Sequence, residues 1–357
     1  MSRVNPVFWV FRTASGKLFP VRRASLRYDI VNQMKPGTSE DELLRRIEAP
    51  FPRPRGGGVG LSIGDDAALW RGKPGFQTIL TCDWFLEGMH FLRELHPPAS
   101  VGWKCLVRAV SDVAAMGGVP RCFLLGLALP PEETGVWLRG FLRGLGRAAD
   151  RFDCPLVGGD TTRQDRILIS VAVVGEIRAG KAVLRSGALP GDRLYVSGRL
   201  GEAELGWREL QRQGGPGRPT SRALRKHLYP QPRLALGQWL RGNRLATAMM
   251  DLSDGLSTDL PRLCAASRVG ATIDLSLLPL VRSDATEEAI ARALHGGDDY
   301  ELLFTVKPSV ERRLPVRYRG VPLTRIGLIS KGRKIVSVTA RGKINPICSG
   351  GWDPFRS

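Results

Sequence analysis

Ser62-Ile63-Gly64-Asp65-Asp66-Ala67-Ala68-Leu69 places two adjacent carboxylates directly after a glycine and between apolar residues. Neighbouring like charges repel each other, and burying them away from water is unfavourable. Taken alone, the stretch is most simply a solvated Gly-Asp-Asp turn. The pattern recurs, however, because carboxylates also stand beside glycines or at the ends of apolar runs in Thr81-Cys82-Asp83, Ser111-Asp112, Gly158-Gly159-Asp160, Asp251-Leu252-Ser253-Asp254-Gly255 and Gly296-Gly297-Asp298-Asp299. The sequence therefore predicts that several carboxylates meet at one site, organised around Asp66.

The carboxylates indicate a type of reaction, because no nucleophile with a matching base accompanies them. The sequence contains no Ser-His-Asp or Cys-His signature. Phosphoryl transfer needs little covalent help from a protein, only positioning and charge neutralisation. Mg²⁺ held between carboxylates and phosphate oxygens supplies that neutralisation. We therefore expect an ATP-dependent phosphotransferase assembled around Asp66.

Length and composition predict a cytoplasmic chain of two domains. The 357 residues are enough for two cores, and the 43% hydrophobic content is ordinary for a globular protein. No apolar run reaches the ~18–20 residues that cross a bilayer, so we expect no membrane partner. The six cysteines are scattered and form no Cys-x-x-Cys pair, which is typical of reduced thiols.

The net charge of +19 raises the alternative of a nucleic-acid-binding protein. The basic residues are mostly Arg, are dispersed along the chain, and are not interleaved with aromatic residues. This distribution is typical of a protein from a genome of biased composition, in which the surface cations are encoded mostly as Arg. We expect no nucleic-acid partner, although the positive field would favour anionic substrates.

The chain divides into three parts by composition. Residues 1–33 are basic and show no sustained period, so we expect a disordered leader. Thr38 or Ser39 can then cap a helix whose first turn is acidic. The pattern resets at Ala188-Leu189-Pro190-Gly191-Asp192, which divides the rest into domains 34–187 and 188–357.

Both domains mix helices and strands, so the fold class is α/β (α+β) in two lobes. In the first domain we expect strands at 67–70, 77–81, 123–129, 155–157 and 167–175, and helices at 103–116 and 132–152. In the second we expect helices from about 202 and at 231–241 and 255–267, and strands near 194–197, 246–251, 271–275, 301–306, 322–329 and 334–339.

Two glycine-rich segments could contact phosphate. Gly175-Glu176-Ile177-Arg178-Ala179-Gly180-Lys181 matches G-x-x-x-x-G-K, but Ala182 replaces the hydroxyl that would hold Mg²⁺, so we expect a chance match. In Gly158-Gly159-Asp160-Thr161-Thr162-Arg163, the glycines would let the backbone approach a phosphate. Asp160 could then hold a metal and Arg163 could meet anionic oxygens. A Gly-Gly turn with a capping Asp is the alternative.

Two further candidates also have ordinary structural interpretations. Asp251-Leu252-Ser253-Asp254-Gly255 lies between an expected strand and helix, where Ser253 or Asp254 could simply cap the helix. In the functional interpretation, the same turn presents two carboxylates to a bound group. His90 stands in a Gly-containing turn beside Glu87, although a lone His is more often a structural hydrogen-bonding residue.

Taken together, these segments resemble the thiamine-monophosphate kinase family, within the superfamily of aminoimidazole ribonucleotide synthetase. The resemblance runs from about Ser39 to Phe355 and rests on six ordered motifs at 63–69, 111–117, 158–163, 184–188, 251–255 and 296–302. It implies a two-lobed fold whose N-terminal mixed sheet pairs across a homodimer, with a C-terminal α/β domain. It also implies transfer of the ATP γ-phosphate to thiamine monophosphate, giving thiamine diphosphate and ADP.

The resemblance also implies roles for individual residues. Asp160 and Asp254 would be catalytic, and His90, Asp298 and Trp352 would contact the thiamine substrate. An aromatic ring such as that of Trp352 suits the cationic thiazolium. ATP would be contacted by Gly159, Asp160, Arg185 and Ser253. Mg²⁺ would be held by Asp66, Thr81, Cys82, Asp83, Asp112, Asp160, Asp251 and Asp254.

The sequence departs from the family pattern at three places. The usual Ser-Thr-Asp is Thr81-Cys82-Asp83, which replaces a hydroxyl with a thiol that prefers softer metals and leaves the Cys82 backbone carbonyl as an alternative ligand. The usual Gly-Gly-Glu-Asp has Asp298 in place of Glu, and the leader has no counterpart. Alternatives are a sister enzyme, either a hydrogenase-maturation factor or a selenophosphate synthetase, or a nucleic-acid-binding protein on a degenerate kinase fold. Cys348 lies nine residues from the end, unlike the terminal cysteine of the first.

Overall fold

A four-stranded mixed sheet forms the base of the first lobe. The computed structural model describes residues 40–51, 58–63, 67–216, 218–281 and 286–355, so the leader and Asp66 lie outside the described residues. The sheet order is β3-β6-β4-β5, with β4 and β5 parallel and the other neighbours antiparallel. The elements of this lobe are α1 (Glu40–Glu48), β1 (Val59–Leu61), β2 (Leu69–Trp70), β3 (Phe76–Leu86), α2 (Pro98–Ala115), β4 (Val119–Leu129), η1 (Pro131–Thr134), α3 (Val136–Phe152), β5 (Leu156–Arg163) and β6 (Leu168–Arg178).

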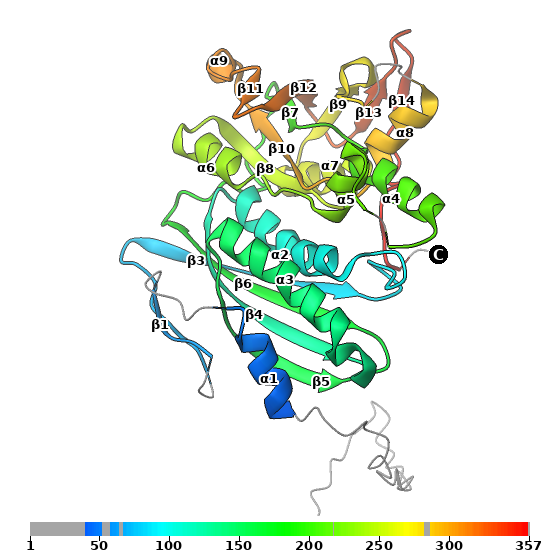
Figure 1. The fold of residues 1–357 in the computed structure, drawn as a ribbon. Helices are drawn as coiled ribbons and strands as arrows, with labels where there is room; N and C mark the ends of the chain where they lie inside the picture. The colour runs from blue at the N-terminus through cyan, green and yellow to red at the C-terminus, as the bar shows by residue number, and fades with distance from the viewer. Residues whose placement is uncertain (1–39, 52–57, 64–66, 217, 282–285, 356–357) are drawn as a thin grey trace, which may run out of the picture. The chain divides into compact units, whose positions relative to one another are not determined.

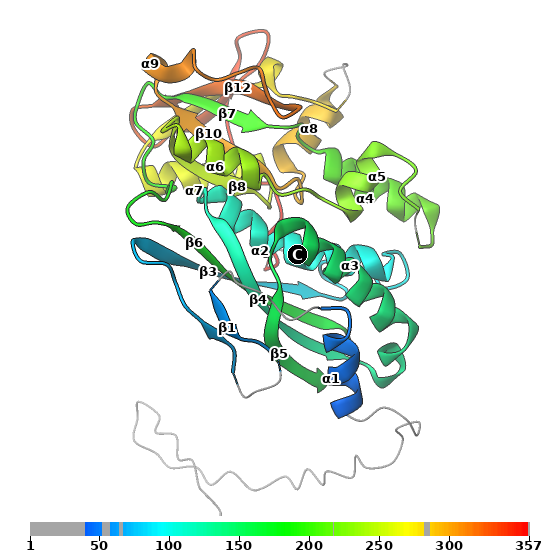
Figure 2. The same cartoon turned by 60° about the vertical axis from the view of Figure 1, so that its left-hand side comes forward.

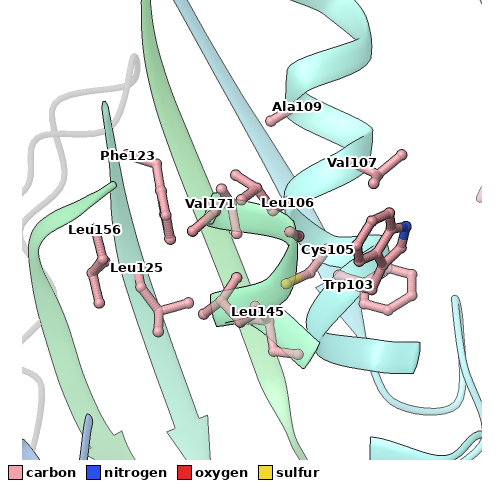
Figure 3. Close-up of a cluster of buried hydrophobic side chains, with 14 of the residues drawn as sticks. Trp103, Cys105, Leu106, Val107, Ala109, Phe123, Leu125, Leu145, Leu156 and Val171 are labelled. Atoms are coloured by element: carbon pink, nitrogen blue, oxygen red, sulfur yellow. The ribbon is translucent and has the colours of Figure 1, made fainter. Parts of the chain in front are cut away.

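Helices α2 and α3 lie side by side against one face of this sheet (Figures 1 and 2). Figure 3 shows Leu106 of α2 and Leu145 of α3 facing Phe123, Leu125 and Val171 of the sheet, all in one buried cluster. The helices approach closely because Gly102 and Gly144 stand where they meet. A Cβ on Gly102 would lie 2.0 Å from the carbonyl oxygen of Phe141, so no other residue fits there without a shift.

Strand β3 divides its side chains between the two faces of the sheet, as the period of two requires. Ile79 and Phe85 are buried beneath the helices, and Thr81 and Asp83 share their face. Leu80 and Trp84 point the opposite way and are 75% and 57% exposed. The face opposite the helices is therefore open and partly apolar.

The second lobe is an eight-stranded sheet that is covered on both faces. Its path is β14-β13-β9-β12-β7-β10-β8, and β11 pairs with β12. Helix α7 packs on one face and α6 on the other, which is why every residue of β10 is buried. The elements are β7 (Arg193–Ser197), α4 (Glu202–Gln213), α5 (Arg222–Leu228), α6 (Leu234–Gly242), β8 (Ala246–Leu252), α7 (Leu256–Ser267), β9 (Gly270–Asp274), η2 (Leu275–Leu277), α8 (Glu287–His295), β10 (Glu301–Val306), α9 (Pro308–Glu311), β11 (Arg317–Tyr318), β12 (Val321–Ser330), β13 (Ile335–Val338) and β14 (Ile344–Pro346).

The residues after β14 return to the turn between β8 and α7. The Trp352 N–H donates to the carbonyl oxygen of Asp254 at 2.9 Å, and Thr258 and Ser349 share a hydrogen bond of 2.9 Å between their hydroxyls. These bonds place the C-terminal Trp352 beside the Asp251–Gly255 motif. None of the helices within the described ranges has the length and apolar character needed to span a bilayer.

The expected class of two mixed lobes is confirmed, with local corrections. Gly175 to Arg178 lie inside β6, so the G-x-x-x-x-G-K match is no phosphate loop, as expected. The strand expected at 155–157 instead continues to Arg163, because Gly158 to Arg163 pair with β4; the alternative of a Gly-Gly turn is wrong. Helix α2 begins at Pro98 rather than 103, since proline suits the first turn of a helix. The domain division at 187/188 stays a prediction.

Candidate active site

Four elements bring the predicted carboxylates together. Thr81 and Asp83 come from β3, Asp112 from α2, Asp251 from the end of β8, and Asp254 from the turn that follows. The Thr81 hydroxyl donates to Asp112 Oδ2. The Ser111 hydroxyl donates to Asp251 Oδ2 at 2.7 Å, which joins α2 of the first lobe to β8 of the second. We refer to Asp83, Asp112, Asp251 and Asp254 as the acidic cluster.

Three carboxyls of the acidic cluster, Asp83, Asp112 and Asp251, are electrostatically unfavourable in the ionised form, whereas Asp254 pairs with Arg262 at 2.5 Å. Burial raises the pKa of Asp83 to about 6, with the attraction of Arg108 and the repulsion from Asp112 and Asp254 included in this value. Burial and repulsion from Asp112 raise the pKa of Asp251 to about 7. The pKa of Asp112 is also raised by burial, against the attraction of Arg185 and Arg108. Such a cluster favours a cation over ionised carboxylates alone.

Asp259 holds the turn that carries Ser253 and Asp254. Its Oδ2 accepts the N–H groups of Ser253, Asp254 and Gly255 at 3.1, 3.0 and 3.1 Å. The side chain is fully buried, and burial together with repulsion from Asp254 raises its pKa to about 6. Asp259 was not among the residues predicted from the sequence, although an acidic side chain in the first turn of a helix was a signal for it.

A cavity of about 670 Å³ adjoins the acidic cluster. It is lined by the three residues predicted to contact the thiamine substrate, His90, Asp298 and Trp352, and by Ser253 and Asp254. The ring centroids of His90 and Trp352 are 6.3 Å apart. The Gly297 and Asp298 backbone reaches the cavity because the Asp298 N–H donates to the carbonyl oxygen of Ser253 at 2.8 Å.

His90 is neutral near pH 7 and has one defined tautomer. The Leu86 N–H donates to His90 Nδ1 at 3.0 Å, so the proton of the neutral ring is on Nε2. Burial, with smaller effects of Arg108 and Lys104 against that of Asp298, lowers the pKa of His90 to about 4. The ring can therefore donate one hydrogen bond from Nε2.

Asp298 stands in a network of buried partners. Lys104 Nζ donates to its Oδ2 at 2.7 Å, and the Tyr300 hydroxyl donates to its Oδ1 at 2.7 Å. Burial alone would raise the pKa of Asp298, but Lys104 and Arg108 outweigh it and hold the pKa below its usual range. Lys104 is only 1% exposed. Lys104 and Arg108 were not among the residues predicted from the sequence, although two cations within an otherwise apolar helical segment were a signal for them.

The loop that presents Asp298 has an unusual backbone. Asp298 and Tyr300 have φ values of 66° and 48°, in the left-handed region that residues other than Gly and Asn seldom adopt. Hydrogen bonds from both backbone N–H groups to the β8 end, at 2.8 Å each, hold this conformation. Such strain is concentrated at functional sites in proteins.

One chain does not bring every predicted residue to the cluster. Asp160 of β5 pairs with Gly126 of β4, which pairs with Ser170 of β6, which pairs with Trp84 of β3. Because paired residues share a face of the sheet, Asp160 lies on the open face with Trp84. The Cys82 thiol lies 3.5 Å from the Ser170 hydroxyl on that face, away from Asp83. Arg185, in contrast, lies near enough to Asp112 to lower its pKa. Gly159 is packed so closely that a Cβ would lie 1.9 Å from the Leu125 carbonyl oxygen.

The residues that could hold a metal are oxygen donors. Among the described side chains, no three of the His, Cys, Asp and Glu type are arranged to ligate one ion. Asp66 lies outside the described residues. Thr81 would contribute a hydroxyl oxygen, which is not one of these four side-chain types. Carboxylate and hydroxyl oxygens with raised carboxyl pKa values fit a hard divalent cation such as Mg²⁺.

Both lobes match known families. The family model for "AIR synthase related protein, N-terminal domain" matches residues 64–177, and that for "AIR synthase related protein, C-terminal domain" matches residues 189–339. The structure of "Hydrogenase Maturation Protein HypE in complex with ATP" is similar, with 20% identity and a TM-score of 0.71 over 88% of this chain and 96% of that chain. At this identity the likeness shows the fold alone.

Two thiamine-monophosphate kinases are more similar in sequence. The enzyme of that name from Escherichia coli O157:H7 is 40% identical over 279 residues, which is 75% of this chain and 84% of the relative. The structure "AaThiL complexed with AMPPCP and TMP" is 33% identical, with a TM-score of 0.69 over 79% of this chain and 88% of that chain. With identity at this level across most of both lobes, the chain belongs to the thiamine-monophosphate kinase family.

Proposed function

We infer that this chain transfers the γ-phosphoryl group of ATP to thiamine monophosphate, giving thiamine diphosphate and ADP. The observation that carries this inference is the cavity lined by His90, Asp298 and Trp352, which shares Asp254 with the acidic cluster. Relatives named for this activity and a related structure with an ATP analogue and TMP support it. A site with positioned charges but no nucleophile suits direct phosphoryl transfer.

The test is an assay of the purified full chain with Mg-ATP and thiamine monophosphate. We expect ADP release that depends on thiamine monophosphate, together with one thiamine diphosphate for each ADP. ADP release that does not depend on thiamine monophosphate would contradict this function and leave a sister enzyme as the better interpretation.

We propose that Mg²⁺ is held by the acidic cluster with Thr81 and Asp66, and that Asp160 from a second copy of the chain is a further ligand. When bound, Mg²⁺ supplies charge neutralisation for the phosphate oxygens. Arg185, beside Asp112, and the backbone of Gly159 and Ser253 would contact ATP. The protein's own contribution is a cluster fixed by a part-buried hydrogen bond from Thr81 and a buried one from Ser111 before substrates arrive.

Within the cavity, His90, Asp298 and Trp352 suit a cationic ring that carries a phosphate. Trp352, 43% exposed, offers an aromatic face to the thiazolium. The Asp298 carboxylate is kept ionised by Lys104 and Arg108, so it can attract the same cation. His90 can donate one hydrogen bond from Nε2 without adding a charge. These groups position the acceptor phosphate towards the acidic cluster.

We also propose a homodimer formed by the open faces of two first-lobe sheets. Leu80, Trp84 and Leu124 are large apolar residues exposed on that face, and such patches on soluble proteins are commonly covered by a partner. Leu124 pairs with Ala172, and Ala172 with Cys82, so apolar positions continue across the sheet. A second copy would bury this patch and bring its own Asp160 to the interface.

We place the enzyme in the cytoplasm, where ATP is available and thiols stay reduced. All six cysteines are free, and four of them are buried. We keep the division into domains 34–187 and 188–357, with a dispensable leader at 1–33, as part of the same proposal.

The raised carboxyl pKa values predict how metal binding depends on pH. Asp83 and Asp251 have pKa values of about 6 and 7, above the unfolded value of 3.8, so the folded protein binds more protons than the unfolded chain between these values. Metal-free stability therefore falls as the pH rises through this range. The lowered histidine pKa values act oppositely, but only below 6.5.

Mg²⁺ requires the ionised carboxylates, so its stabilising effect should grow with pH. We expect Mg²⁺ to raise Tm more at about pH 8 than at about pH 6, as measured by thermal melts at matched ionic strength. Asp112→Asn should remove most of the difference. Equal shifts at both pH values would show that Mg²⁺ binds elsewhere.

Trp352→Ala should raise KM for thiamine monophosphate by ~10-fold with a smaller change in kcat, because a partly desolvated cation–π contact contributes about 1–2 kcal/mol. KM for ATP should change little. Phe355→Ala is the matched control, because Phe355 is an aromatic residue three positions on that is 96% exposed and outside the cavity. Equal effects of the two substitutions would exclude Trp352 from substrate binding.

A further inference from the structure

A second cavity, of about 580 Å³, lies among α3, α5 and the segment before α6. Five cationic side chains line it: Arg147, Arg222, Arg225, Lys226 and Arg233. It shares no lining residue with the cavity beside the acidic cluster. None of the residues predicted for ATP, Mg²⁺ or thiamine monophosphate lines it, so the proposed function does not use it.

Buried carboxylates fix three of these cations in place. Glu301, 1% exposed, accepts hydrogen bonds from Lys226 Nζ and Arg233 Nε at 2.6 Å each. Glu202, 4% exposed in its side chain, pairs with Arg222 Nε at 2.7 Å. Because these carboxylates are held in the protein interior, their partners are positioned before any ligand binds. Lys226 and Arg233 therefore form a fixed inner wall, whereas Arg147, Arg222 and Arg225 are exposed around it.

The remaining two cations give the cavity an excess of positive charge. Arg147 and Arg225 have no carboxylate partner within the described ranges. Five cations against the two carboxylates Glu202 and Glu301 leave an excess of three positive charges. Like charges around one cavity repel, so a multiply charged anion would stabilise the arrangement.

The shape and chemistry of the wall restrict the class of anion. The guanidinium fork matches phosphate oxygens in a bidentate geometry, and four of the five cations are Arg. Trp103 and Tyr229 add aromatic surface, with ring centroids 6.3 Å apart in an edge-to-face arrangement. A volume of 580 Å³ is within the range of small-molecule sites, about 300–1,000 Å³.

We propose that this second cavity binds a small molecule that carries two or three linked phosphate groups, separately from the site of phosphoryl transfer. Arg147 and Arg225 would contact the phosphates directly. The other three cations, Lys226, Arg222 and Arg233, are paired with Glu301 and Glu202. They would add positive electrostatic potential and further hydrogen bonds to the phosphates.

Binding of inorganic triphosphate to the full chain tests the proposal. Calorimetric titrations in metal-free buffer would compare the wild type with Arg147→Gln/Arg225→Gln and with the control Arg143→Gln/Arg212→Gln. Arg143 and Arg212 are exposed on α3 and α4 and line neither cavity, so both double variants lower the net charge equally. Triphosphate can also enter the ATP site, so the result is read from the difference between variants.

We expect the cavity variant to weaken one binding component at least ~10-fold and the control to leave it within ~2-fold of wild type. Kinase turnover should be unchanged in both. Triphosphate should raise Tm for the wild type and the control more than for the cavity variant. Identical isotherms for all three proteins, or equal weakening in both double variants, would overturn the proposal.

Discussion

Asp112→Asn should lower turnover by ~100-fold or more while raising Tm of the metal-free protein. The loss of activity follows because charge neutralisation is most of what the protein supplies to phosphoryl transfer. The gain in stability follows because Asp112 repels Asp83 and Asp251, whose pKa values it raises. The amide oxygen of Asn can still accept the Thr81 hydrogen bond, so the geometry is kept.

The measurements are steady-state ADP release from Mg-ATP with thiamine monophosphate and thermal melts in the presence of a chelator. Asp150→Asn is the matched control, since Asp150 is exposed near the end of α3 and lines neither cavity. A loss of activity that accompanies a lower Tm would indicate a structural role for Asp112. Turnover near that of the wild type would remove the acidic cluster from the active site.

Asp160→Asn should also lower turnover by ~100-fold or more, without changing stability, because Asp160 is exposed and paired only through its backbone. Its place on the open face separates it from Asp83 of the same chain. Gly159 is the residue in register with Leu125, Val171 and Asp83, so the Asp160 side chain points to the other side of the sheet. We therefore expect it to serve the acidic cluster of the partner subunit.

Mixing the two inactive variants tests that expectation. In a dimer of one Asp112→Asn and one Asp160→Asn chain, one site combines both substitutions and the other has neither. Random exchange makes half of the dimers mixed, so about a quarter of the wild-type turnover should return. A mixture that stays inactive after exchange would assign Asp160 to its own chain. Full activity of Asp160→Asn alone would remove Asp160 from catalysis.

The class of fold could be predicted from the sequence, and so could the proximity of four of the carboxylates. Carboxylates at strand ends and helix starts are local signals, and the structure brings Asp83, Asp112, Asp251 and Asp254 together. The period of two in β3 also explains why Thr81 and Asp83, but not Cys82, face α2. Gly158-Gly159 resembled a turn because glycines are common in turns, but pairing with β4 decides its conformation.

Contacts between residues far apart in the sequence could not be predicted from local sequence patterns. Lys104 and Asp298 are 194 residues apart, and only the docking of α2 against the second lobe makes their pairing visible. Helices α5 and α8 were missed because short helices have weak periodicity and depend on tertiary packing. Roles that need a second chain, such as that proposed for Asp160, are likewise absent from any local signal.

The three hydrogen bonds that Asp259 accepts also affect the free energy of ligand binding, because they order part of the site in advance. Ordering one backbone residue costs about 1–2 kcal/mol of conformational entropy, and the turn that carries Ser253 and Asp254 is already ordered by a buried side chain of its own chain. Ligand binding therefore spends none of its free energy on folding this turn. We therefore expect this end of the site to reject a wrong ligand by misfit, because the turn is already held in one conformation.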